Sequence, residues 1–216
     1  LNNQQETVVH WFFGFEWRAP MVIVMLAAFA GGLVISQVYG GGGGKGYYLY
    51  DYVELFNGGA TTVDLSNWSL QYGSATGNFA SSAGNLYAFP AGTTLAAGKY
   101  LLVQVGSAGT SGINLPVTPD LVTQNLSMGQ ASGKVALANI TTALGCGADA
   151  TPCTLPHANI VDMAGWGKSN LSEGGVTINN GAEMTNQQGG VRKDNGCQDT
   201  DHNGNDFDVL SGAALV

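Results

Sequence analysis

The sequence predicts an all-β fold, an antiparallel β-sandwich, and two observations carry that prediction. Short apolar segments alternate with turn residues along most of the chain, which is the pattern of strands that pack in sheets. The 216 residues include 33 glycines and only 10% charged residues, a composition that suits short strands joined by turns. About 180 residues follow the N-terminal segment, enough to bury a core between two sheets.

The first half of this sandwich is predicted over residues 34–72. A first strand is expected at residues 34–39 and a second at residues 52–56, which ends in a glycine-containing turn at residues 57–59. Further apolar positions continue the pattern, and Trp68 among them is expected to be buried. This stretch therefore supplies several neighbouring strands of the fold.

A run of glycines separates the first two expected strands. Gly40 to Gly44 precede Lys45, which is partly similar to a phosphate-binding loop. The residues after Lys45 have the pattern of a strand, whereas such a loop needs a helix whose N-terminus holds the phosphate. We therefore predict a wide turn here.

The order of these segments resembles the lamin tail domain in the form found in exported bacterial proteins. The resemblance begins with ISQVYGGGG at residues 35–43, ELFN at 54–57 and DLSNW at 64–68. It continues through residues 100–104, 115–120, 134–137, 160–167 and 192–201, and so covers about residues 33 to 210. The resemblance implies an immunoglobulin-like antiparallel β-sandwich. A scaffold of this kind hosts many roles, so function must be argued from a site.

The N-terminal segment, residues 1–32, is predicted to be a separate part, a short apolar helix, with the sandwich domain at residues 33–216. Residues 20–38 form an almost uncharged run that is long enough to cross a bilayer, so a membrane anchor is one interpretation. An uncleaved signal sequence and a buried core helix are the alternatives. Residues 2–14, NNQQETVVHWFFG, weakly resemble lipopolysaccharide-assembly protein A type membrane proteins.

The two assignments conflict at residues 33–38, since one backbone segment cannot be helix and strand at once. Either the helix ends near Gly31 and Gly32 or the first strand does not form. We interpret the chain as two unrelated pieces joined at these glycines.

The charge and the cysteines indicate an exported protein without a nucleic-acid surface. The formal net charge of −8, with only seven basic residues, disfavours direct binding to phosphate backbones. Cys146 and Cys153 are close enough in sequence for a local disulfide, which favours an extracellular or periplasmic location. A zinc site formed by these two cysteines and His157 is the alternative. The resemblance implies a lost partner for Cys197, which leaves either a buried thiol or a site of intermolecular pairing.

The sequence offers no catalytic constellation. Four carboxylates are candidates for acid–base pairs but are better explained as solvent-facing strand or turn residues: Glu54, Asp64, Asp162 and Glu173. No catalytic residue and no organic cofactor is therefore expected, and the protein is predicted not to be an enzyme.

One cluster near the C-terminus is a candidate calcium site. Asp199, Asp201 and Asn203 alternate and Gly204 follows, as in the first half of a calcium loop. The position where such a loop has a bidentate glutamate holds a leucine. A structural turn capped by Asx side chains is the alternative. The predicted ligands are Asp199, Asp201, Asn203 and Asp206.

These observations favour a noncatalytic extracellular or periplasmic module for binding, display or assembly, with residues 20–38 as a candidate membrane tether. Its partner would be another protein or a second copy of the chain, because displacing the first strand, residues 33–39, would open a sheet edge. The alternative, implied by the resemblance, is an accessory domain of an exported nuclease or phosphatase system.

Overall fold

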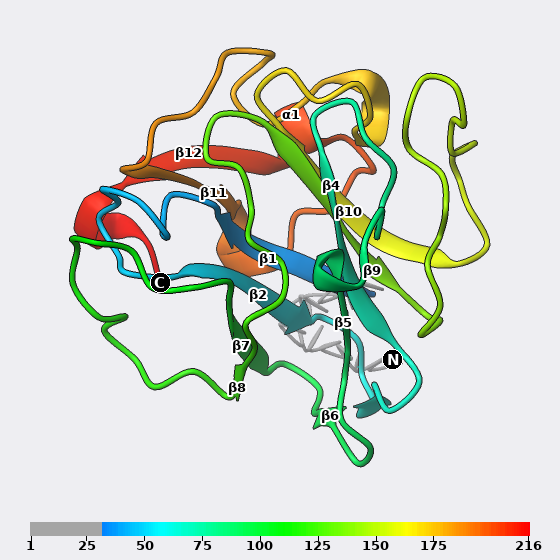
Figure 1. Ribbon diagram of the computed structural model, residues 1–216. Helices are drawn as coiled ribbons and strands as arrows, with labels where there is room; N and C mark the ends of the chain where they lie inside the picture. Colours follow the sequence, from blue (N-terminus) through cyan, green and yellow to red (C-terminus); the bar gives the residue numbers. More distant parts are fainter. Residues whose placement is uncertain (1–31) are drawn as a thin grey trace, which may run out of the picture.

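The computed structural model describes residues 32–216, which fold into two packed β-sheets and a two-stranded ribbon (Figure 1). The strands are β1 Leu33–Tyr39, β2 Asp51–Asn57, β3 Val63–Asp64, β4 Ser69–Ser74, β5 Leu86–Ala88, β6 Thr94–Leu95, β7 Tyr100–Val105, β8 Leu121–Val122, β9 Gly133–Ala138, β10 Ile160–Trp166, β11 Gln188–Arg192 and β12 Phe207–Ser211. One α-helical turn, α1 Asn203–Asp206, and four 3₁₀ turns, η1 Ala83–Asn85, η2 Glu173–Gly175, η3 Asp194–Gly196 and η4 Gly212–Ala214, complete the described residues.

The two sheets are antiparallel with one exception. The larger has the strand order β12-β11-β1-β2-β7-β8, and the smaller has the order β10-β9-β4-β5. Only β8 pairs in parallel with its neighbour, β7. The strands β3 and β6 form the separate ribbon. The all-β prediction is confirmed, and each strand expected in the first half of the fold lies at the predicted place.

The main core lies between the two sheets and is closed by Trp166, which is 1% exposed. Its indole stacks on Tyr72 with ring centroids 6.3 Å apart. Gly133 lies beside this indole, where a Cβ would come within 2.7 Å of the ring, so a side chain at this position would displace Trp166. The predicted burial of Trp68 is wrong, since Trp68 is half-buried at the margin of this core.

A second apolar cluster covers the outer face of the larger sheet. Tyr39 and Tyr52 stack with centroids 5.5 Å apart, and Tyr48 meets Tyr39 edge-on at 5.8 Å. The Tyr48 hydroxyl donates to the carbonyl of Leu215, so the C-terminus closes this cluster. The glycine run forms the predicted turn over it: a Cβ on Gly42 would lie 2.2 Å from the Tyr50 backbone.

The strand β1 decides between the conflicting predictions for the N-terminal segment. Residues 33–38 are a β-strand between β11 and β2, so the predicted membrane run of residues 20–38 is wrong over these residues. The remainder of the predicted apolar helix, residues 1–31, lies outside the described residues. Because β1 is an interior strand, its displacement would break its pairings with both β11 and β2.

Within residues 32–216, no helix has the length and apolar character that crossing a membrane requires.

Candidate functional site: a buried charge cluster between the sheets

The most unusual group of side chains lies where β1 meets β10 and β11. The pairing of β1 with β2 shifts register between Ile35 and Gln37, which marks a β-bulge. On its other side β1 pairs with β11 only at Gln37 and Val38. The backbone of Ile35 therefore needs other partners: its N–H donates to the Asp162 carboxylate, and its carbonyl accepts from Arg192 Nε at 2.9 Å. Two charged side chains thus replace strand pairing.

Arg192 is the centre of the cluster and is only 1% exposed. Its Nη2 lies 2.9 Å from both carboxylate oxygens of Asp162, and its Nη1 lies 3.0 Å from Asp199 Oδ1. The guanidinium also lies 4.6 Å from the centroid of the Phe207 ring. This arrangement satisfies the buried cation with charge-assisted hydrogen bonds and a cation–π contact.

Glu173 joins the cluster from η2. Its Oε2 accepts from Asn203 Nδ2 at 3.0 Å, and its Oε1 accepts from the Met163 N–H at 3.3 Å. Burial, followed by the charge of nearby Asp162, raises the pKa of Glu173 to about 9. At neutral pH the carboxyl is therefore protonated. Burial also raises the pKa of Asp162, and the charge of Arg192 opposes that rise.

Three carboxylates in this cluster approach each other as metal ligands would. Asp162, Glu173 and Asp199 each have one oxygen within 4.8 Å of the others. The guanidinium of Arg192 already lies at 2.9 Å and 3.0 Å from two of them and supplies the balancing positive charge. The cluster is thus complete as an ion-pair network. The prediction that Asp162 faces solvent is wrong, because β10 turns this residue inward. Glu173 is half-buried, and η2 places it beside Asp162.

The structure does not gather the four predicted calcium ligands around a common point. Asp199 pairs with Arg192, and Asp201 is exposed. Asn203 is fully buried, with its Oδ1 accepting from the Gly165 N–H at 2.8 Å. The carboxylate of Asp206 accepts from the N–H groups of Thr200 and His202 at 2.8 Å and 3.2 Å. This geometry supports the alternative of an Asx-capped turn.

Asp206 is the anion at the centre of that turn. Burial would raise its pKa, but the hydrogen bonds from Thr200 and His202 outweigh burial and lower it. His202 caps the single turn of α1, with its Nδ1 accepting from the Asn205 N–H at 3.2 Å. Side chains of this acidic segment therefore accept hydrogen bonds from the backbone N–H groups of the same segment.

A cleft of about 330 Å³ opens beside Glu173. Its wall is largely apolar, and its polar members are His157, Glu173 and Asp201. A volume of this size is at the lower limit of small-molecule sites. The cleft is lined by Leu155, Pro156, His157, Ile160, Val161, Glu173, Gly174 and Asp201.

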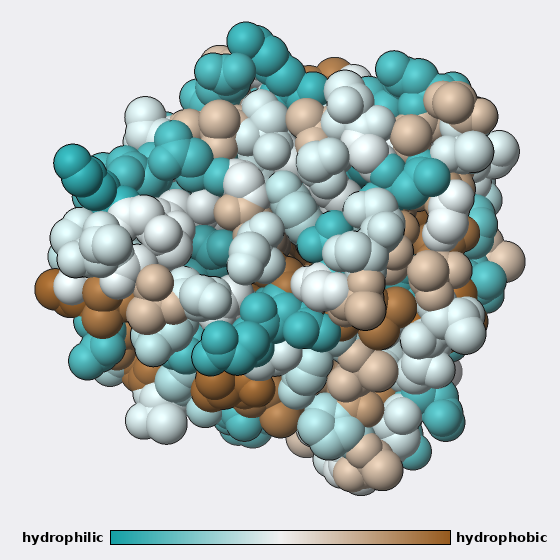
Figure 2. All heavy atoms as spheres, viewed as in Figure 1, coloured by the Kyte–Doolittle hydropathy of each residue, from teal (hydrophilic) through white to brown (hydrophobic). Residues whose placement is uncertain are grey.

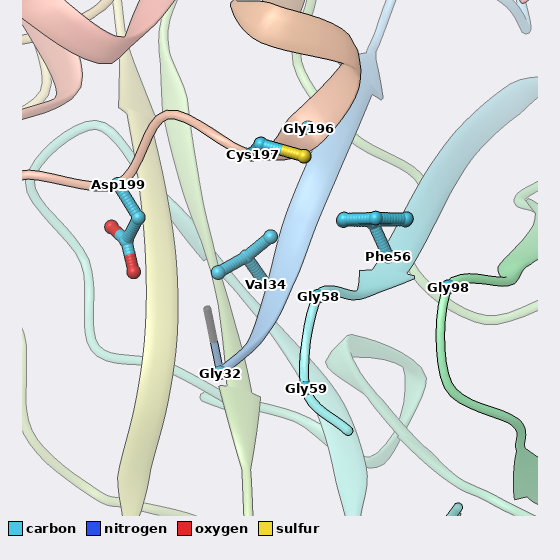
Figure 3. A pocket seen from close by; sticks show the side chains of 9 residues that line it. All are labelled: Gly32, Val34, Phe56, Gly58, Gly59, Gly98, Gly196, Cys197 and Asp199. Atoms are coloured by element: carbon cyan, nitrogen blue, oxygen red, sulfur yellow. The ribbon is translucent and has the colours of Figure 1, made fainter. Parts of the chain in front are cut away.

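The predicted Cys146–Cys153 disulfide is confirmed. Cys146 and Cys153 form a disulfide across a small turn, so they cannot serve as zinc ligands with His157. Cys197 is a free, half-exposed thiol. Figure 3 shows its sulfur above Val34 and Phe56, in a pocket of about 90 Å³ whose remaining wall is mostly glycine.

Sequence comparison agrees with this architecture. The two layers, their strand order and the buried cross-sheet network define an immunoglobulin-like β-sandwich. Residues 27–168 match the Lamin Tail Domain, and the chain belongs to this family. The strands β11 and β12 follow the matched region and complete the larger sheet. No curated protein matches the chain.

Proposed function

We propose that the chain is a noncatalytic extracellular or periplasmic binding module that holds a protein partner at the β8 edge of its larger sheet. The observation that carries this proposal is an exposed apolar edge. Val117 is 50% exposed and Val122 is 60% exposed, and β8 is the terminal strand of the sheet. We call Val117, Val122 and the hollow beside them the edge surface.

The edge surface combines side-chain and main-chain features that suit an extended polypeptide. A hollow of about 310 Å³ is lined by Gln104 and residues 114–119, including Val117. Val122 pairs with Gln104, so the hollow and the exposed strand are neighbours. Figure 2 shows hydrophobic residues at the surface around the position of β8. A terminal strand also leaves main-chain groups that an added strand can pair with, while the apolar side chains supply selectivity.

The proposed location rests on the Cys146–Cys153 disulfide. Such a bond persists in oxidising compartments, which supports a protein that works outside the cytoplasm. The buried charge cluster serves this role as a rigid support, because its charged groups pair with each other and with the β1 backbone.

The proposal is tested by selecting extended peptides from a displayed library on the purified full chain. Val122→Lys places a charge at the centre of the edge surface and is expected to weaken selected peptides at least about tenfold, which is the effect of roughly 1.4 kcal/mol. Val176→Lys is the matched control, since Val176 is 36% exposed and belongs to the segment after η2. Equal binding to wild type and both variants would refute the edge surface.

Sedimentation at several concentrations distinguishes the kind of partner. If the chain forms a dimer that Val122→Lys dissociates and Val176→Lys leaves intact, the partner is a second copy of the chain. An adjacent gene for an exported nuclease or phosphatase whose product binds the edge surface would favour the accessory-domain alternative.

A further inference from the structure

Lys134 is a second buried cation, and its surroundings differ from those of Arg192. It lies on β9 and is 0% exposed. Its Nζ lies 3.0 Å from the carbonyl of Ser74, 3.2 Å from that of Ala75 and 2.7 Å from Asn170 Oδ1. Each of these acceptors is a neutral oxygen. Lys134 is therefore held at contact distance from a carboxamide without a carboxylate in its hydrogen-bonding shell.

Burial gives this amine the character of a nucleophile. Desolvation lowers the pKa of Lys134 to about 8, with Asp149 acting in the opposite direction. At pH 7 about one molecule in ten then carries a neutral amine, far more than for an exposed lysine. A neutral lysine attacks carbonyl groups, as it does in Schiff-base enzymes.

The hydrogen bonds orient that amine toward Asn170. A neutral amine has two N–H groups, and the carbonyls of Ser74 and Ala75 can accept both. In the structure the third N–H donates to Asn170 Oδ1, so loss of that proton leaves the lone pair on the side of the Asn170 carboxamide. The Asn170 backbone N–H donates to the Ala75 carbonyl at 2.9 Å, which fixes the two loops together. Such positioning provides the high effective concentration that an otherwise slow reaction between two amides requires.

Asp149 contacts the side-chain nitrogen of Asn170, which would be the leaving group. Asn170 Nδ2 donates to Asp149 Oδ1 at 2.7 Å. The segment that carries Asp149 is closed by the Cys146–Cys153 disulfide and is anchored by Asn78, whose Oδ1 accepts from the Ala148 N–H at 2.7 Å. The carboxylate is therefore fixed next to the nitrogen that would depart.

We propose that Lys134 and Asn170 form an intramolecular isopeptide bond with Asp149 as the proton carrier. The Nζ–Cγ bond forms and the Cγ–Nδ2 bond breaks, so the side chains become joined by an amide. Asp149 accepts the proton that Nζ loses and returns it to Nδ2, which leaves as ammonia. No oxidant, metal or cofactor enters this balance.

The bond would tie β9 to the segment that follows β10. It would enclose residues 134–170, which include the disulfide loop and most of the smaller sheet's outer hairpin. A covalent closure of this kind removes conformations from the unfolded chain and so stabilises the folded one. A module that holds a partner at its sheet edge would thereby resist unfolding under load.

Mass spectrometry of the purified full chain tests the proposal. After incubation at a mildly alkaline pH, the intact mass is expected to be lower than the sequence mass by one ammonia. Trypsin is expected not to cleave after Lys134, and tandem spectra should show one branched peptide that contains both Lys134 and Asn170. An unchanged intact mass together with tryptic cleavage after Lys134 would overturn the proposal.

The branched peptide is decisive because asparagine–glycine pairs such as Asn57-Gly58 can also lose ammonia by forming a succinimide. A loss of ammonia without a branched peptide therefore counts against the proposal. Asn170→Ala is expected to abolish the branched peptide. Asp149→Asn, a change at an exposed residue, is expected to slow its appearance at least about tenfold, while Glu183→Gln, a charge-matched change at another exposed acid, should leave the rate unchanged.

Discussion

Two buried cations, Arg192 and Lys134, show how the same degree of burial leads to opposite chemistry. Arg192 meets the carboxylates of Asp162 and Asp199, whereas Lys134 meets two backbone carbonyls and an amide. Burial lowers the pKa of Arg192, but these negative charges outweigh it and raise that pKa. For Lys134 burial prevails and the pKa falls to about 8.

The acceptors, and not burial alone, decide whether a buried cation is inert. Ion pairing fixes the charge of Arg192 and makes it a structural link between the sheets. Neutral acceptors leave Lys134 able to lose its proton. Substitutions in the two networks test this distinction.

Arg192→Met is expected to lower the free energy of unfolding by about 3–5 kcal/mol, because it leaves Asp162 buried without its partner and frees the Ile35 carbonyl. Urea denaturation of the variant measures this loss. Lys193→Met is the control at the next residue, where the ion pair with Asp208 is partly exposed. Similar losses for the two variants would contradict the central role of the buried pair.

Relative to the chain in which the Lys134–Asn170 bond has not formed, Lys134→Met is expected to cost less, about 1–3 kcal/mol, since it removes a cation whose acceptors are neutral and leaves no unpaired buried charge. The same denaturation experiment gives the value. If Lys134→Met destabilised the chain more than Arg192→Met, the proposed contrast between the two cations would fail.

Glu173→Gln tests the pH dependence of the Arg192 cluster. The pKa of Glu173 is raised from 4.5 to about 9 in the folded state, so the folded chain keeps a proton that the unfolded chain releases. Stability is therefore lost as the pH rises through this window. As the pH rises, the free energy of unfolding of Glu173→Gln should fall by about 1–2 kcal/mol less than that of the wild type. Parallel pH profiles for the two proteins would show that Glu173 is ionised in the folded state.

Lys168→Met is expected to have the smallest effect, under about 1 kcal/mol, since its ion pair with Glu183 lies in solvent. Thermal melting at low and high salt measures it. A cost close to that of Lys134→Met would show that burial contributes little to either network.

The strands could be predicted from the sequence because each one has a residue pattern of its own. Alternating apolar residues around Val53 and Leu55 placed β2, and the spacing of Cys146 and Cys153 predicted the disulfide. These features depend on neighbours in the chain, so pattern and turn chemistry determine them.

The cluster could not be predicted in the same way. Asp162 and Arg192 are 30 residues apart, and their pairing depends on a bulge in a third strand, at Ile35. The alternation of Asp199, Asp201 and Asn203 predicts a calcium loop because it contains the right ligand types. In the fold, Asp199 instead binds Arg192 and Asn203 caps the backbone of β10, which only the tertiary arrangement reveals.

The interior position of β1 has a consequence for how the chain is made. Its partner β2 follows at once, but Gln37 pairs with Val191, near the end of the sequence. During synthesis from the N-terminus, β1 can therefore pair only with β2 until β11 emerges. The Ile35 carbonyl likewise lacks its hydrogen bond from Arg192 until then. Such distant pairing implies slow folding that is completed only after β11 has emerged.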